Sequence, residues 1–138
     1  MTAQPDQAAR PAPTVETLSI VPGVPQIDEH AEARTIRITL PAGSPSAPPF
    51  RLTGPAYAYV LTGEIVVELE GEAPKVVKAG ETFWEPGGDR IHYQSANNLA
   101  DAESSYVATV FCPAGQPLLT VVSAQELEAR SDRRVHQP

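Results

Sequence analysis

Few side chains in this sequence have the chemistry of a reactive site. The chain contains three histidines and one cysteine among 138 residues. His92 and Tyr93 stand together at the start of a strand-like segment, where an imidazole and a phenol can assist proton transfer. These two are the candidate catalytic residues. Cys112 ends an apolar segment and is expected to be a small core residue, whereas His30 and His136 are expected to be exposed.

The elements that must position these residues are short strands. The segment RTIRITL alternates cleanly and places Ile36, Ile38 and Leu40 on one face. AYAYVLTGEIVVELEG predicts two strands joined around Thr62 and Gly63, and further strand-like segments follow up to residue 122. Turn signals recur about every eight to twelve residues, which is typical of an all-β sandwich or barrel.

The two ends of the chain depart from this pattern. Residues 1–14 are polar and rich in Pro and Ala, which predicts a disordered N-terminal tail. Residues 15–122 are expected to form one β-barrel domain, with VETLSIVPGVP as a candidate edge strand. Residues 123–138 predict a short helix and a tail, because Ser123 and Glu126 have the spacing of a capping box.

Composition limits the partners and the compartment. The formal net charge of −7 argues against binding to nucleic acid, whose phosphates need a basic face. A single cysteine cannot form an internal disulfide, which predicts a cytoplasmic protein. The apolar runs are too short to cross a bilayer, so no membrane association is expected.

Two glycine-containing segments share a spacing with a known barrel family. In GPAYAYVLTG, Gly63 stands where a first motif ends. In GETFWEPGGDRI, Gly80, Pro86 and Gly88 have the spacing of a second motif. In these motifs the segment from about Arg34 to Val122 resembles a small, single-domain cupin. The resemblance implies a cupin-type double-stranded β-helix, or jelly-roll barrel, and a homodimer.

The positions where cupins hold their metal are apolar in this sequence. The resemblance puts the family's ligand positions at Phe50, Leu52, Ala56 and Ile91. A mononuclear site needs about three or four converging nitrogen or oxygen donors, and none of these side chains offers one. Strand alternation places His92 on the face opposite Ile91, and even a bulge that turned it inward would supply one ligand only. We therefore expect no metal and no cofactor.

The same alternation predicts the lining of the barrel. Side chains that share the inward parity are mostly apolar, with small residues beside large ones, and this combination leaves room for a hydrophobic small molecule. The predicted ligand-binding residues are Phe50, Leu52, Ala56, Ala58, Val60, Thr82, Trp84, Ile91 and Tyr93. Tyr57 and Tyr59 have the opposite parity and are expected to pack against another sheet or a subunit.

Three classes of function fit this interior. The first is a metal-independent cyclase or isomerase that holds a hydrophobic, polyketide-like chain in a reactive shape, as in natural-product biosynthesis. The second is a binding or sensing protein with the same cavity and no chemistry. A convergent polar pair deep in the cavity would favour the first class over the second. The third, a metal-dependent oxygenase or isomerase, would need relocated ligands around His92.

Overall fold

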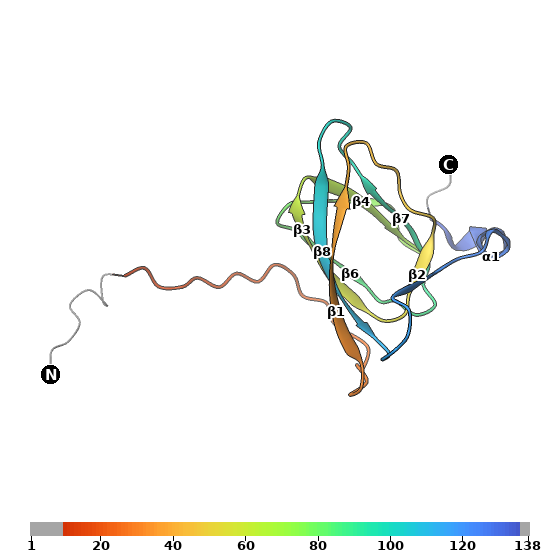
Figure 1. Ribbon diagram of the computed structural model, residues 1–138, viewed down its shortest axis with the longest axis horizontal. Helices are drawn as coiled ribbons and strands as arrows, with labels where there is room; N and C mark the ends of the chain where they lie inside the picture. Colours follow the sequence, from red (N-terminus) through yellow and green to blue (C-terminus); the bar gives the residue numbers. More distant parts are fainter. Residues whose placement is uncertain (1–9, 136–138) are drawn as a thin grey trace.

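The computed structural model describes residues 10–135 and contains two antiparallel sheets that face each other (Figure 1). The four-stranded sheet has the order β1 (Glu32–Leu40), β8 (Ser104–Cys112), β3 (Ala56–Thr62) and β6 (Thr82–Glu85). The five-stranded sheet has the order β5 (Lys75–Lys78), β4 (Glu64–Leu69), β7 (His92–Asn97), β2 (Phe50–Leu52) and β9 (Leu119–Val121). This is the predicted all-β jelly roll, in which the chain crosses repeatedly between the two sheets.

Two glycines allow the strands to approach closely at the turns. Gly63 joins β3 to β4, which lie in different sheets, with a φ of 73°, and a Cβ there would lie 2.1 Å from Ser104 Oγ. Gly54 precedes β3, and a Cβ on it would lie 1.7 Å from the carbonyl oxygen of Phe111. Neither position therefore accepts a side chain without movement of the adjacent strand.

The inner faces of the two sheets form a packed core at one end of the barrel. Its members are apolar side chains of both sheets with relative exposures below 10%: Ala58, Val60, Ile65, Val67, Val77, Phe83, Tyr106 and Ala108. The rings of Phe83 and Tyr106 lie 5.6 Å apart in a tilted arrangement. Cys112 is fully buried in a neighbouring cluster, as expected for a small core residue.

A bulge in β7 reverses the parity predicted for this strand. Glu68 of β4 lies opposite Gln94, but the next residue, Leu69, lies opposite His92. Tyr93 is therefore the extra residue, and it lets His92 share the inward face with Leu69. The bulge thus places an imidazole inside the barrel.

The segment before β1 contains no regular structure in the described residues. The edge strand expected within residues 15–25 is absent there, so this prediction was wrong. Figure 1 shows the segment running away from the barrel, and one hydrogen bond of 3.0 Å joins Ser19 Oγ to Thr82 Oγ1. Residues 1–9 of the predicted disordered tail lie outside the described residues.

The C-terminal helix α1 (Ala124–Ala129) begins as predicted. Ser123 is its N-cap and accepts a hydrogen bond of 3.1 Å from the backbone N–H of Glu126. A short 3₁₀ turn, η1 (Ser131–Arg133), follows it. Within residues 10–135, no helix is long and apolar enough to cross a membrane.

Candidate functional site

A cavity of about 190 Å³ lies between the two sheets, next to the packed core. Its lining is almost entirely apolar: Ile36, Ile38, Leu40, Ala47, Phe50, Leu52, Ala56, Ala58, Ala108, Val110, Leu118 and Leu119, with Glu85, Ser95 and Tyr106 as the polar members. The predicted residues Phe50, Leu52, Ala56 and Ala58 do line it. Their role in ligand binding stays a prediction.

The cavity reaches the surface beside β1. Ile36, Ile38 and Leu40 of this strand are only half-buried, and Leu119 of β9 is 37% exposed. Among the described residues β1 pairs with β8 alone, so its other edge has no partner strand. The cavity therefore opens between the outermost strands of the two sheets.

Three residues of β3 and β6 do not line the cavity as predicted. Ala58 lies opposite Phe83, and directly opposed residues share a face, so Thr82 and Trp84 point outward. There Trp84 packs against Tyr57, with ring centroids 6.1 Å apart. Val60 points inward as predicted, but it is fully buried in the packed core and does not border the cavity.

Ile91 and Tyr93 also face away from the cavity, because of the bulge in β7. Both are buried beneath α1, together with Val122 and Leu127. The guanidinium of Arg134 lies 4.5 Å from the centroid of the Tyr93 ring. Burial raises the pKa of the Tyr93 phenol, whose oxygen has no hydrogen-bond partner among the described residues. Tyr93 is therefore not placed to act on a molecule in the cavity.

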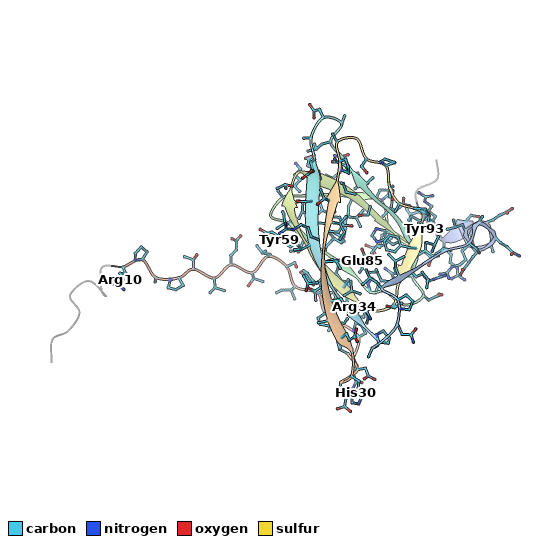
Figure 2. The ribbon with its side chains drawn as sticks, in the orientation of Figure 1. Arg10, His30, Arg34, Tyr59, Glu85 and Tyr93 are labelled. Atoms are coloured by element: carbon cyan, nitrogen blue, oxygen red, sulfur yellow. The ribbon has the colours of Figure 1, made fainter. Side chains whose placement is uncertain are left out.

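The inward imidazole of His92 forms a pair with Glu85. Its Nδ1 lies 2.7 Å from Oε1 of Glu85, and the side chains are 2% and 9% exposed. This contact is close, but its angle is poor for a hydrogen bond. Phe50 stacks on the other side of the ring at 4.5 Å. Figure 2 shows Glu85 between the sheets and Tyr93 towards α1.

The hydrogen bonds of His92 define where its protons lie. Nε2 lies 2.8 Å from the carbonyl oxygen of Gln94, which can only accept, so Nε2 carries a hydrogen. Nδ1 then meets Oε1 of Glu85 at 2.7 Å, and two lone pairs would repel at this distance. A hydrogen on either group would relieve this repulsion.

A second polar pair borders the cavity from β7 and β8. Ser95 Oγ and the Tyr106 hydroxyl are 2.8 Å apart and join the two sheets across the interior. Tyr106 is 8% exposed, and burial raises the pKa of its phenol. The cavity thus has two distinct polar groups on an apolar wall.

These residues do not fit a metal ion of the cupin type. Phe50, Leu52 and Ala56 occupy three expected ligand positions and offer no donor atom. The carboxyl group of Glu85 and the imidazole of His92 also point inward, but they face each other. Among residues 10–135, no group of three or more His, Cys, Asp or Glu side chains is arranged to hold a metal.

A larger surface cleft of about 460 Å³ lies at one end of the barrel, bordered by Gly54, Pro55 and Phe111. Its titratable lining residues, Asp28 and His30, are exposed, and His30 lies 3.3 Å from a carboxylate oxygen of Glu29. Because the titratable side chains that line this cleft are exposed, the interior cavity is the stronger candidate for a reactive site.

The outer face of the five-stranded sheet carries a network of ion pairs beneath α1 and η1. Arg130 binds Glu70 and donates to Asp89 Oδ1 at 3.0 Å, and Arg134 donates to both oxygens of Glu68 at 2.8 and 2.9 Å. Arg51 of β2 binds Glu126 of the helix. These charges attach the C-terminal segment to the sheet.

Sequence reasoning missed Glu85 and Tyr106 as cavity residues. Both signals were present in the pattern. Glu85 is two residues after Phe83, and Tyr106 is two before Ala108, so each shares a face with a core side chain. Glu85 was overlooked because the parity of β6 was assigned from Thr82 and Trp84.

Several solved structures have a fold similar to that of this chain. A structure of oxalate oxidase in complex with the substrate analogue glycolate is 26% identical over 65% of this chain and 46% of that chain, with a TM-score of 0.55. This chain therefore spans slightly less than half the length of that enzyme. A cupin-like protein from Thermotoga maritima is 12% identical over 76% of this chain and 75% of that chain, also with a TM-score of 0.55.

A third structure shares the fold over more of its own length. An uncharacterised protein with a double-stranded β-helix domain from Klebsiella pneumoniae is 14% identical over 77% of this chain and 90% of that chain, with a TM-score of 0.54. No protein-family model matches the sequence, and no curated protein matches it either. The jelly-roll topology and these structural likenesses together identify the chain as a member of the cupin superfamily.

Proposed function

We propose that the interior cavity binds a small, mostly apolar molecule and that Glu85, paired with His92, moves a proton on it. The observation that carries this proposal is a carboxyl group on the wall of an apolar cavity, 2.7 Å from a buried imidazole. A carboxyl group is costly to place in apolar surroundings, and such groups are often found where acid–base chemistry occurs. The function is that of a cofactor-free isomerase.

The size of the cavity limits the substrate. A dry apolar cavity of about 150 Å³ can hold benzene, so about 190 Å³ suits a molecule of one ring or a short chain. The described residues that line it include no Lys or Arg, so an anion such as a small carboxylate would find no partner there. The glycolate bound by the oxalate oxidase neighbour is therefore not a guide to the ligand of this chain.

The pair can move a proton without any net change in the protein. With the proton on His92, the Glu85 carboxylate accepts a proton from a C–H group of the substrate. The resulting carboxylic acid returns it to another carbon of the same molecule. The Gln94 carbonyl holds the Nε2–H of His92, so that Nδ1 always faces the carboxyl group. His92 thus positions and balances the charge of Glu85.

The carboxyl group of Glu85 in the cavity favours one of the three classes of function that fit the sequence. A pericyclic ring closure, as in polyketide-like biosynthesis, needs no carboxyl group in the cavity, so proton transfer accounts for Glu85 better. A protein that only binds or senses its ligand needs no buried acid–base pair either. Among residues 10–135, no group of side chains is arranged to hold a metal, so these residues do not support a metal-dependent reaction.

Benzisoxazole is a suitable test substrate because one base is enough to open it. The base removes the ring C–H proton, the C≡N bond forms, the N–O bond breaks and a cyanophenolate leaves. We expect wild-type protein to accelerate this reaction, and Glu85→Gln to lower the accelerated rate by about 100-fold or more. The release of cyanophenolate, followed by absorbance, measures the rate.

Two control measurements identify the reason for a loss. Leu52→Trp fills the cavity and should remove both the rate and the binding of toluene, which is followed by NMR titration. Glu85→Gln should remove the rate and leave toluene binding within about twofold. Equal rates in wild type and Glu85→Gln would exclude Glu85 as the base. Toluene binding that is unchanged in Leu52→Trp would exclude the cavity as the site.

The assembly and the location of the protein also stay proposals. We infer a homodimer that uses the outer face of the four-stranded sheet, where Tyr59 and Leu61 are each 38% exposed beside Tyr57 and Trp84. Light scattering of wild type and Tyr59→Glu tests it, and a monomeric wild type would remove it. A cytoplasmic location is inferred from Cys112, which is buried and free.

A further inference from the structure

The hydroxyl pair of Ser95 and Tyr106 has one hydrogen that the protein does not use. Each hydroxyl carries one hydrogen, and the single bond of 2.8 Å between the two oxygens uses one of them. Within the described part of the chain, neither hydroxyl makes another hydrogen bond. Both residues border the cavity, so the remaining hydrogen is available to a molecule inside it.

The relative acidity of the two hydroxyls favours Tyr106 as the residue that donates this hydrogen. A phenol is a stronger acid than an aliphatic alcohol and is therefore the better donor to an oxygen that gains negative charge. In that arrangement Ser95 donates to the Tyr106 oxygen, and Tyr106 donates into the cavity. Burial raises the pKa of Tyr106, so its phenol keeps its hydrogen through the neutral pH range.

We propose that the substrate of this site is a small ketone or aldehyde, whose carbonyl oxygen accepts a hydrogen bond from Tyr106. This inference rests on the proton transfer proposed for Glu85. The carbonyl is held at the hydroxyl pair, and the carbon next to it faces Glu85. Both groups border the same cavity, one on β6 and the other on β8 of the four-stranded sheet.

The chemical step follows from these two contacts. Glu85 takes a proton from the carbon beside the carbonyl, and the electrons of that C–H bond form a C=C bond. The electrons of the C=O bond move onto oxygen, where the Tyr106 hydroxyl stabilises the charge. In a substrate that carries a C=C bond next to this carbon, return of the proton to the far end of that bond restores the carbonyl and leaves the C=C bond beside it. No oxidant, reductant or cofactor is consumed.

A purely structural role for the hydroxyl pair makes a different prediction. In that case the bond between Ser95 and Tyr106 only joins β7 to β8, and ligands would not sense it beyond a general change in the cavity. A ketone and a hydrocarbon of the same shape would then respond equally to its removal. Cyclohexanone and methylenecyclohexane are such a pair, since they differ only in the oxygen and the CH₂ group.

The experiment is a titration of both ligands into wild type, Tyr106→Phe and Ser95→Ala, followed by NMR. We expect Tyr106→Phe to weaken cyclohexanone about threefold to tenfold, the effect of one hydrogen bond, and to leave methylenecyclohexane within twofold. Ser95→Ala is the matched control, because it removes a hydroxyl of the pair but leaves the donor. It should change the affinity for cyclohexanone less than Tyr106→Phe does.

Each result has a defined meaning. Equal weakening of both ligands in Tyr106→Phe, or no weakening of either, overturns the carbonyl site. Loss of the ketone contact in Tyr106→Phe, combined with no acceleration of benzisoxazole opening by wild type, supports the donor and removes Glu85 as a base. If Tyr106→Phe does not fold, the infrared C=O stretch of cyclohexanone bound to wild type decides. A shift to lower frequency than in an apolar solvent supports the hydrogen bond, and an unshifted band overturns it.

Discussion

Buried carboxyl groups have different partners on the two sides of the five-stranded sheet. On the outer face, Glu68 and Glu70 are buried beneath the C-terminal segment, and Arg134 and Arg130 neutralise them. Within the barrel, Glu85 of the opposite sheet faces the imidazole of His92, which projects from the inner face of β7. The outer carboxylates are held by guanidinium groups that remain charged at any pH a protein survives. The inner one faces a partner that can give up its proton.

The partner of a buried carboxyl group determines whether that group can exchange a proton. An arginine partner fixes a carboxylate in its ionised form, which suits attachment of a helix but prevents acid–base exchange. A histidine partner can give up or accept a proton, so such a pair can take part in proton transfer. The contrast predicts that changes on the outer face affect stability first, whereas changes on the inner face affect activity first.

The largest expected effect comes from breaking an outer pair. Arg134→Ala removes a cationic side chain that donates two hydrogen bonds to Glu68, which has no exposed surface. We expect a loss of about 3 kcal/mol in the free energy of unfolding, measured with urea. Arg134→Ala combined with Glu68→Gln should recover most of it. A loss below about 1 kcal/mol in the single variant would show that water reaches Glu68.

The inner pair should respond with the opposite sign. Glu85→Leu replaces a buried carboxyl group with an apolar side chain of similar size. We expect the free energy of unfolding to rise by about 1–2 kcal/mol while the opening of benzisoxazole is lost. Urea unfolding and the absorbance assay measure the two effects on one sample. A destabilised Glu85→Leu would mean that the pair holds the fold together.

The smallest effect sharpens the contrast through pH. Hydrogen bonds from Arg130 and Arg51 lower the pKa values of Asp89 and Glu126 below their ordinary range. A lowered pKa in the folded state means that its stabilising contribution is present above the unfolded pKa, about 4, and is lost as pH falls through the folded value. Acidification below about pH 4 should therefore loosen α1.

The amide resonance of Leu127 reports this transition, because Leu127 lies in α1 and packs on the sheet. Its pH dependence should be reduced in Glu126→Gln, which removes one of the two carboxylates. An identical titration in wild type and Glu126→Gln would exclude the contact with Arg51 as the cause.

The parts of the fold that depend on local sequence could be predicted. The alternation of Ile36, Ile38 and Leu40 predicted β1, and Gly63 marks the predicted junction between β3 and β4. The N-cap at Ser123 depends on residues three positions apart. In each case the determining contacts are made within a few residues of the chain.

The parts that depend on pairing between distant strands could not. The bulge at Tyr93 exists because β7 shifts by one residue against β4, about 25 positions earlier in the chain, and single-strand alternation does not show such a shift. As a result His92 was placed on the wrong face. The residues after the helix were expected to form a tail, yet Arg134 binds Glu68, 66 positions away.

One feature of the barrel separates how tightly a ligand is held from how quickly it leaves. The cavity opens beside β1, and among the described residues this strand is held to the sheet by β8 alone. Displacing it therefore breaks one ladder of hydrogen bonds, which includes the 2.9 Å contact between the Thr35 and Thr109 hydroxyls on the outer face. The residence time of a bound molecule thus depends on the β1–β8 ladder, whereas its affinity depends on the lining.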